Sequence, residues 1–256
     1  MIKVVTWNVN SINSRLERVK AFLERESPDF LCLQELKCSE DKYPLESITA
    51  TGYHSAIFGQ KAYNGVAILS KKPVEILFRN FDPDDDASRS ITIRTPFGFD
   101  LINAYVPNGQ AVGTEKYAYK LAWLKKAKKF VQQHWTPSDK LVFVGDFNIA
   151  PDDRDVYDPV AWKEHIHCSA GERTALNDLV SIGFIDSFRM HDQSSGVFSW
   201  WDYRELSFAR NKGLRIDLIY ATPLAAASCR SVRIDKDERR GDKPSDHAPV
   251  IATFDF

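Results

Sequence analysis

The segment KLVFVGDFNIAP, residues 140–151, decides the fold, because an apolar run ends there directly in polar side chains. The run over residues 140–147 is short, rich in valine and phenylalanine, and typical of a buried strand. Similar patterns predict strands at residues 2–9, 29–35, 65–70, 74–78, 90–106, 196–201, 214–221, 228–235 and 249–254. Residues 90–106 contain TPFG, which we interpret as a hairpin turn.

Three segments between these strands have helical periodicity. Residues 15–26 place Leu16, Val19, Phe22 and Leu23 on one face. Residues 114–135 carry Leu121, Leu124, Lys128 and Val131 at helical spacing, with Thr114 as the N-cap. Residues 172–183 predict a third helix, with Gly183 as its stop. Since we find no repeat and no Gly/Ser-rich linker, we expect residues 1–256 to form a single α/β domain, with two sheets packed face to face and helices outside.

Composition excludes a membrane protein and leaves the partner open. The chain has 256 residues, 43% of them hydrophobic, but no run approaches the roughly 20 apolar residues of a membrane span. Its four cysteines form no C-x-x-C pair, so we expect a soluble, cytoplasmic protein. The net charge of −1 sums acidic clusters at 82–86 and 151–155 and basic runs at 125–129 and 239–243, and neither supports nor excludes nucleic acid.

Polar residues stand where the predicted strands end or begin, and they can converge on one rim of the sheets. They are Asn8, Glu35, Tyr105, Asp146, Asn148, Asp217, Asp246 and His247. Most of them also have a structural interpretation, such as a helix cap, a turn residue or a solvated acid. Asp217 is different, because a carboxylate inside the apolar strand RIDLIY is costly unless it is paired, and His247 is the natural partner.

These side chains predict a metal-assisted hydrolase. The carboxylates of Glu35, Asp146 and Asp246, with the amide oxygens of Asn8 and Asn148, form the hard oxygen set that suits Mg²⁺ or Mn²⁺. An imidazole oriented by a carboxylate adds proton transfer or stabilises charge on a phosphoryl oxygen. The combination indicates hydrolysis of a phosphate ester.

Six motifs, in order from residue 5 to residue 254, resemble the exonuclease III branch of the endonuclease/exonuclease/phosphatase superfamily. They are TWNVNS, LQELK, NAYVPNG, GDFNIAP, GLRIDLIY and PSDHAPV. The resemblance implies a four-layer α/β sandwich and a divalent metal, usually Mg²⁺, anchored by Glu35. It also implies that Asp146 activates the attacking water, that Asn148 orients it or stabilises the transition state, and that Asp217 holds His247 against the phosphate. Tyr105 would lie beside that phosphate, and Asn8, Asp146, Asn148 and Asp246 near one or two metal positions.

The segment FSWWDYRELSFARNKGLRID, residues 198–217, resembles the part of these enzymes that forms the abasic-sugar pocket and contacts DNA. Trp200, Leu214 and Ile216 match the apolar wall of that pocket. A tryptophan-rich corner of the core is the alternative interpretation, for Trp201 in particular. The side chains expected to contact DNA are Asn10, Arg204, Arg210, Lys212 and Lys243. The resemblance implies a monomeric Mg²⁺-dependent DNA repair nuclease that acts on abasic sites, nicks and 3′ ends of duplex DNA.

His167 departs from the family pattern, since many relatives have a smaller or uncharged residue there. Our hypothesis is that its imidazole restricts entry of an internal abasic nucleotide and biases the enzyme toward blocked 3′ ends; a surface histidine ahead of a helix is the alternative. Two other functions stay open, a phosphatase of inositol phosphates or lipids and a non-catalytic DNA-binding relative.

Overall fold

The first of two mixed six-stranded sheets joins the two ends of the chain. The computed structural model describes residues 1–256. This sheet has the order β11-β12-β1-β2-β4-β3. Its strands are β1 (Ile2–Asn8), β2 (Phe30–Gln34), β3 (His54–Phe58), β4 (Val66–Ser70), β11 (Cys229–Ile234) and β12 (Val250–Phe254). Only β1 and β2 pair in parallel, while the other neighbours are antiparallel.

The second sheet has the order β5-β6-β7-β8-β10-β9 and also contains a single parallel pair, β7 with β8. Its strands are β5 (Glu75–Arg79), β6 (Ser90–Arg94), β7 (Asp100–Tyr105), β8 (Leu141–Asp146), β9 (Ile185–Asp186) and β10 (Asp217–Ala221). In each sheet a helix connects the parallel strands, as a parallel connection requires.

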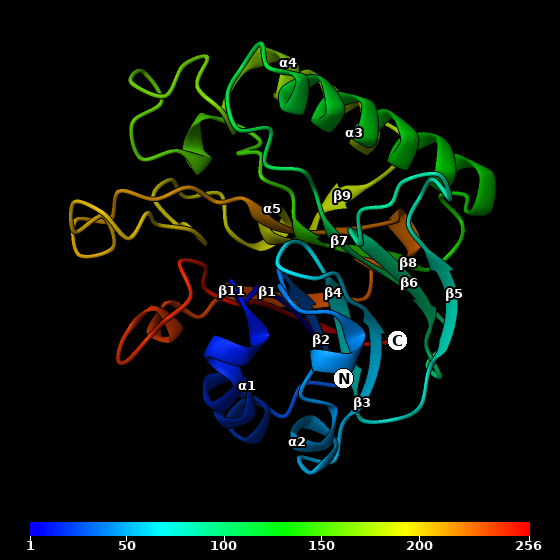
Figure 1. The fold of residues 1–256 in the computed structure, drawn as a ribbon. Coiled ribbons are helices and arrows are strands. Elements are labelled where there is room, and N and C mark those ends of the chain that lie inside the picture. Colours follow the sequence, from blue (N-terminus) through cyan, green and yellow to red (C-terminus); the bar gives the residue numbers. More distant parts are fainter.

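Four helices cover the outer faces of the sheets, α1 (Ile12–Glu26), α2 (Leu45–Thr49), α3 (Glu115–His134) and α4 (Ala170–Val180) (Figure 1). The short helix α5 (Ser187–His191) contacts β10 and β11 of the two different sheets, and α6 (Pro223–Ala226) contributes Ala225 and Ala226 to the core between the sheets. There are 3₁₀ turns at Glu40–Lys42, Asp153–Asp155 and Lys236–Arg239. In Figure 1, α1 and α2 lie below the first sheet, and α3 and α4 lie above the second. The predicted four-layer α/β sandwich is confirmed.

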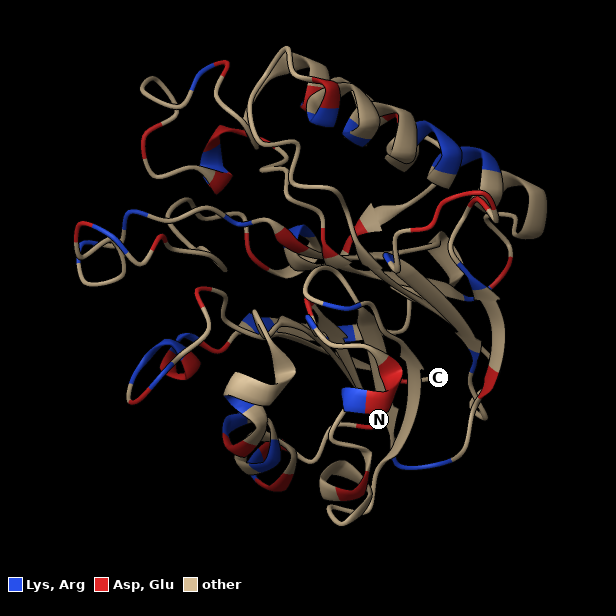
Figure 2. Cartoon of the chain, in the orientation of Figure 1, with Lys and Arg blue, Asp and Glu red and all other residues tan.

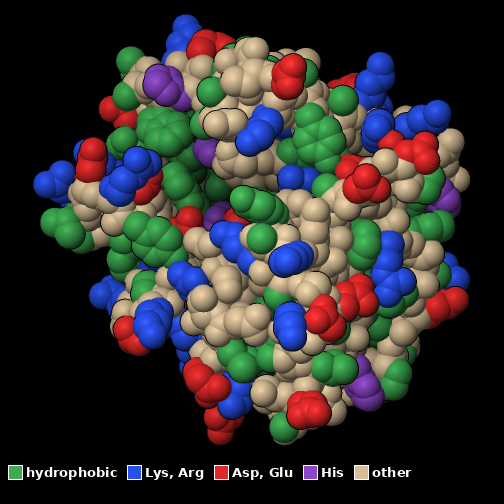
Figure 3. Space-filling view, viewed as in Figure 1, with side chains coloured by type: hydrophobic (Ala, Val, Ile, Leu, Met, Phe, Trp, Pro, Cys, Tyr) green, Lys and Arg blue, Asp and Glu red, His purple; other side chains and the backbone are tan.

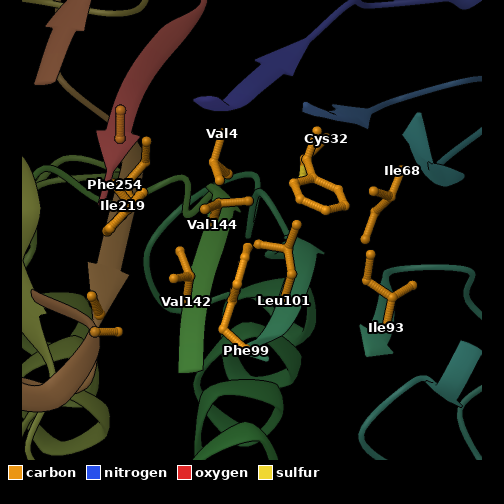
Figure 4. Packing of buried hydrophobic residues seen from close by; sticks show 14 of the residues in the cluster. Val4, Cys32, Ile68, Ile93, Phe99, Leu101, Val142, Val144, Ile219 and Phe254 are labelled. Carbon is orange, nitrogen blue, oxygen red and sulfur yellow. The ribbon is translucent and has the colours of Figure 1, made fainter. Parts of the chain in front are cut away.

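The sheets pack face to face through alternate residues of their strands (Figure 4). Val4 of β1 and Leu101 of β7 belong to one central cluster of 20 buried side chains. Their chain neighbours Val5 and Ile102 belong to two outer clusters, shared with the helices. Since successive side chains of a strand point to opposite faces, strands that are buried on both faces are apolar at nearly every position. This explains the continuous apolar runs in the sequence.

The predicted N-cap of α3 is confirmed, whereas the bounds of α4 differ from those predicted. Thr114 caps α3 by accepting a hydrogen bond from the Tyr117 backbone N–H at 3.2 Å, as predicted. In contrast, α4 begins at Ala170, where Ser169 and Glu172 form a capping box, and ends at Val180. Gly183 therefore lies in the turn beyond the helix, with φ 121°.

The predicted strand over residues 196–201 is wrong. Trp200 makes only isolated bridges, to Leu214 and to His247, and the segment is otherwise a loop. Trp201 is fully buried and packs with Phe198 and Ala248, so its reading as a core residue is correct. The sequence also gave no prediction for β3, β9, α2, α5 and α6, which are short elements.

The basic run of α3 is a solvated helix face (Figure 2). Lys126 lies 2.5 Å from Asp82 of the acidic cluster at 82–86, and Lys128 lies 2.6 Å from Asp178 of α4. These ion pairs offset the charge of two of the four lysines in the run at 125–129. None of the helices is both long and apolar enough to cross a membrane.

Candidate active site

The polar residues at the strand ends lie at one rim of the two sheets. Asp146 ends β8 and is the register partner of Asp217, which begins the antiparallel strand β10. Tyr105 ends β7, opposite Asp146 in the parallel pair. In the facing sheet, Asn8 ends β1 and Glu35 directly follows its parallel partner β2. Figure 3 shows a hollow in the surface, with acidic and histidine side chains at its floor.

His247 and Asp217 form the buried pair expected from the sequence. Nδ1 of His247 lies 2.9 Å from Oδ2 of Asp217, which also accepts a hydrogen bond from Ser199 Oγ at 2.7 Å. Burial alone would lower the pKa of His247, but the negative charges of Asp217 and Asp146 outweigh it and raise the pKa to about 10. The imidazole is therefore cationic at neutral pH, and its Nε2 lies 3.8 Å from Asp146.

The loop that carries His247 is fixed to β1. Ser245 Oγ donates to the Asn8 carbonyl at 2.6 Å and accepts from the His247 backbone N–H at 3.2 Å. Trp7 Nε1 donates to the His247 carbonyl at 3.2 Å. These bonds hold the imidazole over the rim before any substrate binds.

The carboxylates of Glu35 and Asp146 form a candidate metal centre beside His247. One polar side-chain atom of each of these three residues lies within 4.8 Å of the others. Burial raises the pKa of Asp146 to about 7; His247 opposes the increase, while Asp217 and Glu35 add to it. The carboxylates of Glu35, Asp146 and Asp217 lie around the imidazolium, and Glu35 is also paired with Lys37 Nζ at 2.9 Å. The hard oxygen donors of Glu35 and Asp146 fit a divalent cation.

The amide of Asn8 links the two carboxylates of this centre. Its Nδ2 donates to Glu35 at 2.8 Å and to Asp146 at 2.9 Å, while its Oδ1 accepts from the Asn10 backbone N–H at 2.9 Å. In this structure the amide nitrogen of Asn8 therefore orients the two carboxylates. The prediction that the amide oxygen of Asn8 faces a metal stays a prediction.

Asn148 lies beside Asp146 in a left-handed backbone conformation, with φ 52°. Its Nδ2 donates to Asp146 at 3.2 Å and its Oδ1 accepts from Asn108 at 3.2 Å, so its amide oxygen is also engaged. Its carbonyl accepts two further bonds, from Lys120 Nζ at 2.7 Å and from His167 Nδ1 at 2.6 Å. Two buried donors thereby hold this unusual backbone conformation.

Tyr105 supplies a hydroxyl next to the carboxylates. Burial and the charges of Glu35 and Asp146 raise its pKa well above 10, and Arg89 lies over its ring at 5.1 Å. The hydroxyl therefore stays protonated and can donate a hydrogen bond to an anion.

Asp246 connects the centre to its surroundings. It accepts from Asn10 Nδ2 at 2.9 Å and from Trp200 Nε1 at 3.0 Å. Burial alone would raise the pKa of Asp246, but the charge of His247 and these two bonds lower it. Asp246 therefore remains an anion that fixes Asn10 and Trp200 at the edge of the hollow.

Comparison with known proteins assigns this arrangement to a family. The family model described as the Endonuclease/Exonuclease/phosphatase family matches residues 5–247. Exodeoxyribonuclease III of Haemophilus influenzae is 34% identical over 266 residues, which cover 99% of this chain and 100% of the relative. The chain belongs to the endonuclease/exonuclease/phosphatase family. Within that family it is a hydrolytic nuclease of the exonuclease III branch.

Solved structures of this branch match over the whole length. The 3′-5′ exonuclease NExo from Neisseria meningitidis is 44% identical with a TM-score of 0.96, and both chains are covered completely. A variant of the 3′ phosphatase NExo from Neisseria, bound to a product DNA hairpin, is 42% identical, and an AP endonuclease from Archaeoglobus fulgidus is 37% identical. Both have a TM-score of 0.96 over 100% of both chains.

The residues that the exonuclease III resemblance assigns to an apolar wall form one cluster, but most of it is covered. Leu214 and Ile216 are 0% and 1% exposed and pack beneath Trp200. Only Trp200 is partly exposed. Among the basic residues, Arg204 is paired with Asp202 at 2.6 Å. Arg210 and Lys243 are exposed and Lys212 is half-buried.

His167 is buried, so its reading as a surface histidine is wrong. Its ring lies 6.1 Å from that of Trp200, and its Nδ1 contacts the Asn148 carbonyl. Burial and the charge of Lys120 lower its pKa to about 3, against the effect of the Asn148 bond, so the imidazole is neutral. It fills space between the catalytic rim and Trp200.

Sequence reasoning missed Lys120 and Glu172. Lys120 donates a hydrogen bond to the carbonyl of Asn148 in the nuclease site, and Glu172 is its buried partner. Both side chains are 0% exposed and form an ion pair. Lys120 precedes Leu124 and Val131 by four and eleven positions, so the periodicity of α3 already placed it on the buried face. A lysine on the apolar face of an amphipathic helix was the signal.

Proposed function

We propose that this nuclease is a Mg²⁺-dependent DNA repair enzyme that hydrolyses phosphodiester bonds at abasic sites and blocked 3′ ends of duplex DNA, with 3′ ends favoured. The observation that carries the proposal is the His247–Asp217 pair, held over the carboxylates of Glu35 and Asp146. The relatives are an exodeoxyribonuclease III, a 3′ phosphatase bound to a DNA hairpin and an AP endonuclease, and they support DNA as the substrate.

Glu35 and Asp146 would hold the metal, which we propose to be Mg²⁺, with Mn²⁺ as a substitute. When bound, the cation supplies positive charge to the phosphate and to the leaving oxygen. In this proposal Asn8 keeps the two carboxylates in register through its two donated bonds.

The chain's own side chains then have distinct tasks. Asp146, which lies at the centre of the rim with its Oδ2 3.8 Å from His247 Nε2, accepts the proton of the attacking water. The water oxygen bonds to phosphorus as the bond from phosphorus to the leaving oxygen breaks. The cationic His247 and the neutral Tyr105 hydroxyl donate hydrogen bonds to the phosphoryl oxygens, where charge increases. Asn148 Nδ2 orients Asp146 and the water.

The two alternative functions have less support. If the protein were a phosphatase of inositol phosphates or lipids, we would expect its relatives to act on such substrates. The relatives described above are instead an exodeoxyribonuclease III, a 3′ phosphatase bound to DNA and an AP endonuclease. A non-catalytic DNA-binding relative would lack part of the site. Here Glu35, Asp146 and His247 all converge.

The first prediction concerns metal dependence. With Mg²⁺, purified protein is expected to cleave a duplex that contains one internal abasic analogue and to remove the phosphate from a nick that ends in 3′-phosphate. Addition of EDTA is expected to abolish both reactions, because the phosphate and the leaving oxygen would lose the positive charge that the cation supplies. Gel assays of both substrates measure this, with readdition of Mg²⁺ as the control. No cleavage of either substrate with Mg²⁺ would refute the proposed function.

The preference for 3′ ends rests on His167. A sugar that leaves the helix needs space beside Trp200, and the buried imidazole occupies that space. A phosphate at a 3′ end can reach Glu35 and Asp146 without placing a sugar beside Trp200. The bond from His167 to the Asn148 carbonyl fixes the ring, so it does not simply swing aside.

His167→Ser is therefore expected to raise the ratio of abasic-site incision to 3′-phosphate removal by about tenfold or more, because it opens the space beside Trp200. Initial rates on the two substrates, measured side by side, give the ratio. His165→Ser is the matched control, since His165 is exposed and lies two positions away. An equal ratio in the wild type and His167→Ser would disprove the bias.

Three further features of the protein complete this proposal. We propose that residues 1–256 form one domain, since β1 and β12 of opposite ends pair in one sheet. We also propose a monomer, which sedimentation tests, and a cytoplasmic location. Four free, buried cysteines support a reducing compartment.

A further inference from the structure

A second cavity, of about 230 Å³, lies outside the catalytic centre on the far side of Trp200. We propose that it binds the base of an unpaired nucleotide, with the phosphate of that nucleotide contacting Lys212. This inference rests on the proposed function only in taking DNA as the ligand. The cavity is bordered by Tyr157, Trp162 and Trp200, with Arg204 and Lys212 at its edge. No member of the metal centre lines it.

Its aromatic side chains are fixed in place without a ligand. Tyr157 and Trp162 meet edge to face, with ring centroids 6.2 Å apart and an interplanar angle of 75°. Trp162 and Trp200 pack on the buried cluster that contains Val156 and Leu214. Ring faces that are partly exposed and already ordered are what a nucleobase stacks on, and such stacking is tolerant of base identity.

Four charged side chains border the cavity, and their charges sum to zero. Arg204 is paired with Asp202, whereas Lys212 and Glu205 make no ion pair. The Nζ of Lys212 lies 5.9 Å from the centre of the Tyr157 ring, so this free cation lies beside the aromatic faces. That position suits the phosphate of a nucleotide whose base stacks on those faces.

The size of the cavity favours one unpaired base. It is smaller than the roughly 300–1,000 Å³ of pockets for drug-sized ligands, so it suits a single flat ring system. A paired base has both faces covered by its neighbours in the duplex and cannot enter. The occupant is therefore a base that has left the stack or lies beyond the end of the duplex.

Trp200 connects the cavity to the nuclease site. Its Nε1 donates to Asp246, and its ring lies beside His167, while it also borders the cavity. Figure 3 shows hydrophobic side chains along the edge of the hollow. A strand whose phosphate lies over the carboxylates thus has a stacking site close by for an unpaired neighbour.

The test uses duplexes that end in 3′-phosphate and carry one unpaired 2-aminopurine at the 3′ terminus, or at the first or second template position beyond it. Binding in EDTA, without turnover, is followed by 2-aminopurine fluorescence. We expect quenching in the wild type at one of these positions or more, and none for a fully paired 2-aminopurine. Trp162→Ala and Tyr157→Leu are each expected to abolish the quenching and weaken binding of that duplex about tenfold.

Leu206→Ala is the matched control, because Leu206 is 69% exposed, lies on the loop that carries Arg204 and Lys212, and does not border the cavity. Lys212→Ala should retain the quenching but reduce the salt dependence of binding by about one phosphate contact. Wild-type fluorescence that never changes, or that Trp162→Ala and Tyr157→Leu leave unchanged, would overturn the proposal. Removal of 3′-phosphate from a fully paired nick by the wild type tests the proposed function separately, because a fully paired substrate offers the cavity no unpaired base.

Discussion

Replacement of His247 by alanine is expected to lower kcat for 3′-phosphate removal by about 1,000-fold or more, with little change in the fold or in DNA binding. The variant removes the buried cation that faces Asp146 and leaves Asp217 without its partner. Steady-state kinetics measure kcat and KM, and a titration with DNA in EDTA measures binding. Since the imidazolium acts where charge increases, the loss should appear in kcat rather than in KM.

His191→Ala is the control for this experiment, because His191 is exposed at the end of α5. Asp217→Asn gives a second variant, which keeps the volume of the side chain but removes the charge that raises the pKa of His247. It should lose kcat in the same direction. A loss below tenfold in His247→Ala would contradict the role that we assign to the imidazole.

Lys120→Met is expected to lower the free energy of unfolding by about 3–5 kcal/mol, because it leaves the carboxylate of Glu172 buried without its cation. The variant also removes one of the two side-chain donors to the Asn148 carbonyl. We therefore expect kcat to fall about tenfold at temperatures where the variant is folded, with KM within about twofold. Urea denaturation and steady-state kinetics measure the two effects.

Lys116→Met is the matched control, since Lys116 lies one turn earlier on α3 and is exposed. Lys120→Arg keeps the charge and should recover part of both losses. If Lys120→Met and Lys116→Met had the same stability and the same kcat, the buried pair would neither stabilise the fold nor position Asn148.

The sequence predicted most of the sheets because their strands are apolar on both faces. Strand β3 was missed for the opposite reason, since it is an edge strand, pairs only with β4 and begins with the exposed His54. The segment at 196–201 has strand-like composition, but its Ser199 and Trp201 backbone N–H groups bond to Leu214 and Asp246 across loops. Composition alone does not distinguish an aromatic loop that fills a corner from a strand.

The candidate site could be predicted in membership but not in detail. Asp217 was informative because an acid in an apolar strand requires a partner, and His247 is that partner. The orientation of the Asn8 amide depends on contacts with Glu35 and Asp146, which lie 27 and 138 residues away. No local pattern contains that information.

Strand β12 lies between β11 and β1, and it is translated after every other strand of its sheet. Until it leaves the ribosome, β1 has no antiparallel neighbour on that side, and the loop with His247 has no strand to anchor it. The catalytic imidazole and the centre of the first sheet therefore depend on the same pairing of distant segments. Such long-range closure slows folding, and it couples the geometry of the catalytic rim to the completion of the sheet.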